Sequence, residues 1–474
     1  MKISELFGLN KTQAELDFVD IDPTMDTPLF LDPHFLGKRV DKWSIDATLT
    51  LKSFFQEIID LIRDGKTSLA QSLFDHLHEP NSTCLGLSVG KPRGNGVGDG
   101  DTAKFFFSLL KSRAIQTGLV QDLQDNILFV DNFGKDKLSD MTTNIITKHL
   151  LDYTVSQCTL HNIPLVSNLS SGYYWSRQHS EWEIAPIQRL IATDKAIMLI
   201  PKGIVSFSES YTPQKYYNHF VLNFLQNEQL KLNSALVQKR KSGKRFVTKQ
   251  SIKVDNPNSK EFLRKFTSKH PDVLKDFKQK TNSVPLQNSQ ISDINYKTIA
   301  NKLATDLTKI TSGNHTAGKF HNHVLGILEL LFYPDLINPV KEQEINQGRK
   351  RIDITFDNGS TSGIFFNLSN HFQLPCGYIY VECKNYSTDV ANPELDQLSG
   401  RFSVNHGKVG ILVCRSFDDR ALFINRCRDT YSAGRGLVIP LTDQDLVNLL
   451  DNIHEENRTF FNNYLNNIVK EIVL

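Results

Sequence analysis

The sequence predicts an α/β protein, with a mixed central sheet flanked by helices in its C-terminal third and an additional α-rich domain at the N-terminus. Helical and strand-like patterns alternate after residue 316, whereas apolar residues recur mainly at helical spacing through residues 1–200. The 474 residues also exceed the roughly 100 to 200 of one typical domain. With 39% hydrophobic and 22% charged residues, the composition is that of a globular chain.

The first expected domain covers residues 1–200 and has no evident role. Helical spacing is clear in segments 49–62, 104–112 and 141–155. A glycine-rich stretch at 89–104 precedes a helical run, but it lacks the Gly-Lys-Ser/Thr end of a P-loop and the G-x-G-x-x-G spacing. We therefore favour a turn-rich loop there over a phosphate cradle.

Three other features argue against further metal sites. The aspartates and prolines of segment 17–33 favour turns and helix starts over catalysis. His321 and His323 lie two residues apart on a predicted helix, so they do not face one another. The six cysteines form no C-x-x-C pair, which favours reduced thiols in a cytosolic setting.

A basic helical connector is expected over residues 201–315. The net charge of the chain is only +2, yet residues 231–280 hold 15 Lys or Arg against 4 Asp or Glu. Such a run is either a solvated charged face or the footprint of a polyanion, and the sequence favours neither. The candidate nucleic-acid contacts lie in a predicted loop: Lys239, Arg240, Lys241, Lys244 and Arg245.

The third expected domain covers residues 316–474. Its predicted elements are, in order, a helix at 318–334, strands at 338–345, 350–356 and 378–386, a helix at 392–402, a strand at 408–414 and a final amphipathic stretch at 454–474. Alternation within two of the strands singles out three polar residues. Asp353 lies on the opposite face from the adjacent isoleucines, and Glu382 and Lys384 lie opposite three apolar neighbours.

Two acids and a lysine can therefore meet over one sheet face. Hydrolysis of a phosphodiester needs an activated water, neutralisation of charge at phosphorus and stabilisation of the leaving oxygen. A hard cation such as Mg²⁺, held by one or two carboxylates, supplies much of each. Asp353 and Glu382 suit that role, and Lys384 can orient or help deprotonate the attacking water.

This pattern, an acid in one strand followed by E-x-K in the next, resembles the PD-(D/E)XK nuclease superfamily, whose fold is restriction-endonuclease-like. The resemblance covers residues 316–440, about a quarter of the chain. It implies that Asp353 and Glu382 bind Mg²⁺ or Mn²⁺ together with the main-chain carbonyl of Cys383, and that Lys384 acts on the water.

Two further positions bear on the resemblance. An acid on the first core helix often joins the site in that superfamily, and Glu329 matches it as the only formal charge between Lys319 and Asp335. A charge in so apolar a run needs a partner, a metal or solvent. The proline that often precedes the first acid is absent, since Ile352 stands there, and the superfamily tolerates this.

The following helix extends the match. Asn392 and Pro393 form a suitable cap and first turn. Gln397 and Arg401, four residues apart, share one helix face. The resemblance implies that Gln397 lies beside the active centre, and Arg401 is a candidate phosphate contact.

These features together predict a divalent-metal-dependent deoxyribonuclease, by family analogy one of a bacterial restriction or anti-phage defence system. A nuclease acting on RNA and an inactive nucleic-acid-binding or assembly module are the alternatives, and a sensory role for the N-terminal domain is open. No segment reads as a signal peptide or a membrane span, so a cytoplasmic protein is expected. A homo-oligomer and a defence-system partner protein are both open.

Overall fold

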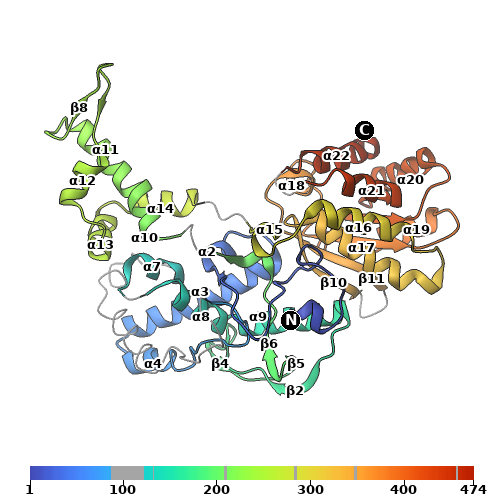
Figure 1. The fold of residues 1–474 in the computed structure, drawn as a ribbon, viewed down its shortest axis with the longest axis horizontal. Coiled ribbons are helices and arrows are strands. Elements are labelled where there is room, and N and C mark those ends of the chain that lie inside the picture. The colour runs from blue at the N-terminus through green and yellow to red at the C-terminus, as the bar shows by residue number, and fades with distance from the viewer. Residues whose placement is uncertain (87–121, 132, 208–210, 282–284, 346–349, 455–456) are drawn as a thin grey trace.

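The computed structural model describes residues 1–474 apart from 87–121, 132, 208–210, 282–284, 346–349 and 455–456, and only the backbone at 342–345 and 350–352. The glycine-rich stretch at 89–104 and the expected helix at 104–112 therefore lie outside the described residues. The fold is mixed α/β (Figure 1). Its buried apolar residues form two clusters, one drawn from residues 3–286 and the other mainly from residues 299–472.

The N-terminal cluster is built mostly from helices, as expected, with small sheets at its margin. The helices are α1 (Ile3–Leu6), η1 (Gln13–Glu15), α2 (Pro33–Leu36), α3 (Lys42–Arg63), α4 (Thr67–Ser72), η2 (Leu123–Asp125), α7 (Asn126–Phe129), α8 (Lys135–Ile145), α9 (Thr147–His161) and η3 (Lys202–Ile204). The strands are β1 (Phe30–Leu31), β2 (Val166–Ser170), β3 (Tyr174–Ser176), β4 (Glu181–Glu183), β5 (Pro186–Ala192), β6 (Lys195–Ile197) and β7 (Val205–Ser206). The helical pattern at 141–155 is shared by α8 and α9, which meet at Ile146.

Residues 213–280 form an arm that projects from this part of the molecule (Figure 1). Its elements are α10 (Pro213–Lys215), η4 (Tyr216–Val221), α11 (Leu222–Lys231), β8 (Gln238–Lys239), β9 (Arg245–Phe246), α12 (Lys249–Asp255), α13 (Lys260–Lys269) and α14 (Pro271–Lys280). Tyr216, Leu263 and Phe277 on this arm belong to the N-terminal cluster. The segment expected to connect two domains thus packs with the first of them.

The C-terminal cluster surrounds a five-stranded sheet in the order β10 (Leu336–Ile345), β11 (Lys350–Asn358), β12 (Tyr378–Lys384), β13 (Val409–Cys414), β14 (Leu437–Thr442). The first three strands are antiparallel and the last three are parallel, so β12 belongs to both patterns. The mixed sheet predicted from the sequence is confirmed. Every residue of β13 is buried, as expected for a parallel strand covered on both faces.

Helices flank this sheet. They are α16 (Tyr296–Thr308), η5 (Asn314–Thr316), α17 (Ala317–Phe332), α18 (Gly363–Asn370), α19 (Asn392–Ser399), α20 (Arg420–Ser432), α21 (Asp443–Asp451) and α22 (Thr459–Val473). The short helix α15 (Asn288–Ile291) lies against η1, and its Ile291 packs with the N-terminal cluster. Because α16 packs on α17 and α21, the C-terminal cluster starts earlier in the chain than the boundary expected at residue 316. No described helix is long and apolar enough to cross a membrane.

Candidate active site at the centre of the C-terminal sheet

The pairing of β11 with β12 determines how the two predicted acids lie. Ile354 pairs with Val381 in this antiparallel ladder, so Asp353 and Glu382 come opposite each other one step further along. Directly opposite residues of an antiparallel pair place their side chains on the same face. The main-chain N–H of Cys383 donates to Asp353 Oδ2 at 2.8 Å, which holds the first carboxylate against β12.

A buried hydrogen-bonded chain surrounds the second acid. Lys384 Nζ donates to Glu382 Oε1 at 2.8 Å and to Gln397 Oε1 at 2.8 Å. Arg401 Nη1 donates to Glu382 Oε2. Glu382 is only 1% exposed, so its charge depends on these two cations. The structure thus brings Asp353, Glu382, Lys384, Gln397 and Arg401 together, while Arg401 meets a carboxylate in place of the expected phosphate.

The charge state of Lys384 follows from its surroundings. Burial lowers the pKa of its ammonium, but the hydrogen bond and charge of Glu382, with smaller effects of Tyr386 and Asp353, outweigh burial and leave that pKa raised. The side chain is therefore a cation at neutral pH. It can donate hydrogen bonds to a phosphate oxygen or to a water.

One histidine reaches this site although the sequence did not single it out as a site residue. His321 on α17 makes a hydrogen bond through Nε2 to the carbonyl of Cys383 at 3.1 Å. That carbonyl is the main-chain oxygen that the sequence offered as a metal ligand. The spacing of His321 and His323 carried no signal of this contact, because the partner comes from a strand about sixty residues later.

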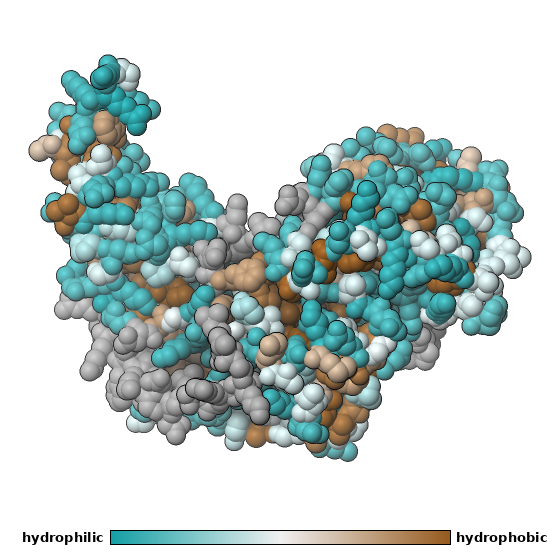
Figure 2. Space-filling view, in the orientation of Figure 1, coloured by the Kyte–Doolittle hydropathy of each residue, from teal (hydrophilic) through white to brown (hydrophobic). Residues whose placement is uncertain are grey.

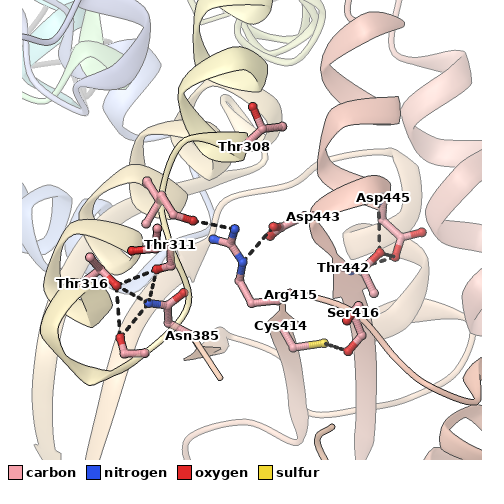
Figure 3. Close-up of polar contacts among 12 residues, drawn as sticks. Thr308, Thr311, Thr316, Asn385, Cys414, Arg415, Ser416, Thr442, Asp443 and Asp445 are labelled. Atoms are coloured by element: carbon pink, nitrogen blue, oxygen red, sulfur yellow. Dashed lines mark hydrogen bonds and ion pairs between the residues drawn. The ribbon is translucent and has the colours of Figure 1, made fainter. Parts of the chain in front are cut away.

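The carboxyl ends of the parallel strands are tied to the turn between α16 and α17 (Figure 3). The side-chain amide of Asn385 donates to the carbonyls of Thr311 and Gly313 at 3.2 and 2.9 Å and to Thr316 Oγ1 at 2.9 Å. Arg415 donates to the carbonyl of Ile310 at 2.7 Å and pairs with Asp443 at 3.0 Å. Since Asn385 directly follows Lys384, this network fixes the end of the strand that carries the lysine.

Glu329 lies elsewhere. It is buried on α17, and the charged groups that act most on it are Asp17, Lys202, Lys11 and Glu15, all from the N-terminal part of the chain. Burial, with the nearby charge of Asp17, raises the pKa of its carboxyl to about 8. The structure thus does not support its assignment to the catalytic and metal-binding residues. The N-terminal part of the chain packs around this carboxyl, and the raised pKa keeps it mostly protonated at neutral pH.

A second group of possible metal ligands lies on the β3–β4 hairpin. Ligand atoms of His179, Glu181 and Glu183 are within 4.8 Å of one another, the one such trio found in the described part of the chain. His179 and Glu183 already bond each other, and Glu183 also accepts from Tyr174 at 3.0 Å. His179 and Glu181 are exposed and Glu183 is half-buried, and these mutual contacts account for the arrangement without an ion.

The donor atoms at the centre of the sheet fit a hard divalent cation. Asp353 and Glu382 offer carboxylate oxygens on one face, and Cys383, which directly follows Glu382 in the chain, offers its carbonyl. Mg²⁺ is bound in proteins by one or two carboxylates and keeps several waters. The cysteine thiol does not compete for this role, because burial raises the pKa of Cys383 well above its usual range.

The fold and the site define an α/β protein with a mixed sheet that carries buried Glu382 and Lys384, half-buried Asp353 and, at the edge of the site, exposed Gln397. A family model described as a domain of unknown function, DUF8370, matches residues 8–212. The match covers less than half of the chain and ends before the C-terminal sheet. The comparisons found no match among curated proteins or solved structures.

Proposed function

We propose that the C-terminal part of this protein is a divalent-metal-dependent nuclease that hydrolyses phosphodiester bonds in DNA. The observation that supports this most is the meeting of Asp353, Glu382, Lys384 and Gln397 on one sheet face, from two strands and a helix. An E-x-K tripeptide that arises by chance is not expected to have an opposed carboxylate and a glutamine that accepts from its lysine. These residues are the ones that the superfamily resemblance names.

The roles follow from the contacts. Asp353 and Glu382 would hold the cation, which when bound supplies charge neutralisation at the phosphate and a more acidic water. Lys384, oriented by Gln397, donates to the phosphate or the attacking water. Arg401 balances the charge of Glu382 and competes with the cation for the same carboxylate.

That last contact favours a second candidate function. Both oxygens of Glu382 are engaged by cations of the chain itself, an arrangement that a module which binds nucleic acid without cutting it could also keep. The two functions differ in whether DNA is cut when metal is supplied.

The test is hydrolysis by the purified full chain. Supercoiled, linear and single-stranded DNA and RNA are incubated with Mg²⁺, with Mn²⁺ and with EDTA, using wild type, Asp353→Asn and Lys384→Ala. We expect metal-dependent cutting of DNA that either substitution lowers by about 100-fold or more. Asp418→Asn and Lys309→Ala, at exposed positions away from the site, are the matched controls and should cut normally.

Thermal unfolding of each variant separates loss of fold from loss of chemistry. Binding without cutting under any metal would support the non-cutting module, and cutting of RNA alone would change the substrate. Equal cutting by wild type and both site variants would exclude the proposed centre.

A further inference from the structure

The tip of the arm is a short hairpin with five cations on eight consecutive exposed residues, 238–245. β8 and β9 are joined by a tight turn in which Gly243 N donates to the carbonyl of Arg240 at 2.9 Å, with Gly243 at φ +79°. A positive φ of this kind suits glycine. The tip of the arm is hydrophilic in Figure 2 and lies far from the C-terminal sheet in Figure 1.

Most of the other Lys and Arg side chains in residues 231–280 already form ion pairs or hydrogen bonds within the protein. Lys278 pairs with Asp122 and Asp125, Lys265 with Glu261, and Lys280 with Asp276. Lys260 and Arg264 donate to main-chain carbonyls of residues 129–133, which anchors the arm to the N-terminal part. Because these side chains have partners within the protein, they are not free to bind a polyanion.

The hairpin cations have no such partners. Across the residues that the structure describes, no ion pair involves Lys239, Arg240, Lys241, Lys244 or Arg245. Arg245 only donates to Asn233 at 3.2 Å, and Arg240 lies 5.2 Å from the ring centroid of Phe246. Five like charges on so short a turn repel one another, and a polyanion that neutralises several at once relieves this repulsion.

The shape of the tip favours a duplex over a single strand. Proteins that bind single strands offer exposed aromatic rings on which bases stack. The one aromatic residue of this hairpin, Phe246, is half-buried and covered by Arg240. A two-stranded ribbon fits the major groove of B-DNA, and cations on such a ribbon reach the phosphates on either side.

We propose that the β8–β9 hairpin is a duplex-DNA-binding element that contacts the phosphate backbone without sequence preference. This inference rests on the proposed nuclease function, because the hairpin would be a second contact of that nuclease with its DNA substrate, apart from the catalytic site. The hairpin supplies affinity, while Asp353, Glu382 and Lys384 supply chemistry. The two contributions are separable because the hairpin and the sheet lie far apart in the molecule (Figure 1).

The test compares two triple variants of the full chain. The first is Lys239→Gln, Lys241→Gln, Lys244→Gln in the hairpin. The matched control is Lys148→Gln, Lys265→Gln, Lys280→Gln, which removes the same charge from exposed lysines that each pair with a carboxylate four residues away. Binding of a labelled DNA duplex is followed by fluorescence anisotropy in EDTA, where no cutting can occur, over about 0.05 to 0.3 M salt.

We expect the hairpin variant to bind tenfold to 100-fold more weakly near 0.1 M salt, in rough proportion to three lost phosphate contacts. The slope of log affinity against log salt should fall by about 3 for this variant and stay unchanged for the control. Equal losses in both variants, an unchanged hairpin variant, or equally tight binding of a single strand of the same length would each overturn the inference.

A second set of assays, with Mg²⁺ added, distinguishes this proposal from the nuclease proposal. If wild type binds duplex through the hairpin but cuts nothing, the nuclease assignment fails and the hairpin assignment stands. If wild type cuts and the hairpin variant cuts with unchanged apparent affinity, the hairpin assignment fails alone. Thermal unfolding checks that both triple variants are folded.

Discussion

Glu382 is the residue on which the candidate site depends. A carboxylate that is 1% exposed is costly to keep charged, and here Lys384 and Arg401 each donate to one of its oxygens. Removing either partner leaves part of the charge uncompensated in a poorly solvated place. The same two contacts explain why a bound divalent cation would have to share Glu382 with the chain's own cations.

Arg401→Ala should lower the free energy of unfolding by roughly 2 to 3 kcal/mol, because Glu382 keeps only Lys384 as a cationic partner. Added Mg²⁺ should raise the thermal midpoint of this variant more than that of wild type, since a metal ion can replace the lost charge. Calorimetry with and without Mg²⁺ measures both effects.

The control for this substitution is Arg435→Ala. Arg435 pairs with Asp396 at 2.7 Å, but both side chains are more than half exposed, so the loss should stay below about 1 kcal/mol. An Arg401→Ala midpoint equal to that of the control would contradict the buried-charge interpretation.

The raised pKa of Glu329 predicts how the stability of the fold depends on pH. Its carboxyl has a pKa of about 8 in the folded protein against an ordinary value of 4.5, so the folded state retains a proton that the unfolded state loses. Stability from this group is complete below about pH 4.5 and is lost as the pH rises towards 8. Glu329→Gln, which is neutral throughout, should therefore gain stability relative to wild type between pH 5 and 8.

Denaturant titrations of both proteins across that range check the sign. Glu228→Gln, at a half-buried helical position away from this interface, is the matched control and should show no such trend. A difference between Glu329→Gln and wild type that is flat or falls with pH would refute the assignment.

At the scale of elements, the end of β12 is held by its neighbours in space. Asn385 donates to two carbonyls and a hydroxyl of the turn at 311–316, and Gly313 N donates back to the Asn385 carbonyl at 2.7 Å. The contacts leave the backbone beside Lys384 little freedom. Asn385 is thus a positioning residue for that lysine and touches no reacting group.

Asn385→Ala should slow the cutting step at saturating DNA by roughly tenfold and leave duplex affinity nearly unchanged, because Lys384 loses its alignment but no DNA contact is removed. The loss of a buried donor should also cost about 1 to 3 kcal/mol of stability. Single-turnover rates measure the cutting step, and anisotropy measures the affinity for the duplex. Thr308→Ala, whose hydroxyl bonds only within its own helix, should change neither, and a matching drop in affinity for Asn385→Ala would contradict the positioning role.

The contrast between strands and helices shows what the sequence could and could not predict. Alternation at period two placed Asp353, Glu382 and Lys384 on one face, because the strand itself sets that geometry. Gln397 and Arg401 both reach the site as expected, although α19 ends at Ser399 and Arg401 lies in the turn that follows it. Glu329 was assigned to the site wrongly and the contact of His321 with Cys383 was not predicted, since the side of α17 that each faces depends on packing against distant segments.

At the scale of the whole molecule, the two hydrophobic clusters meet along α17. Gly326 on that helix faces η1 and the residues just before it, and an added Cβ would come within 2.8 Å of Lys11 Nζ and 3.3 Å of Glu15 Oε1. Gln157 of α9 also donates to the carbonyl of Pro339 on β10 at 3.2 Å. The glycine permits close approach of the two parts.

Gly326→Val should therefore force α17 away from η1 and cost about 1 to 3 kcal/mol, as overpacking of a tight contact does. Limited proteolysis should accelerate together with a fall in the thermal midpoint. Gly318→Ala, on the same helix with open space around it, should be neutral or stabilising by up to about 1 kcal/mol. Equal behaviour of the two variants would show that the contact is dispensable.

The mixed order of the sheet has a consequence for finding related sequences. Asp353 and Glu382 face each other because β11 and β12 are adjacent, whereas the residues between those strands, including α18, supply none of the residues of the candidate site. The intervening chain could vary in length without moving either carboxylate. A search pattern for relatives should therefore leave that gap open and require the alternation of both strands.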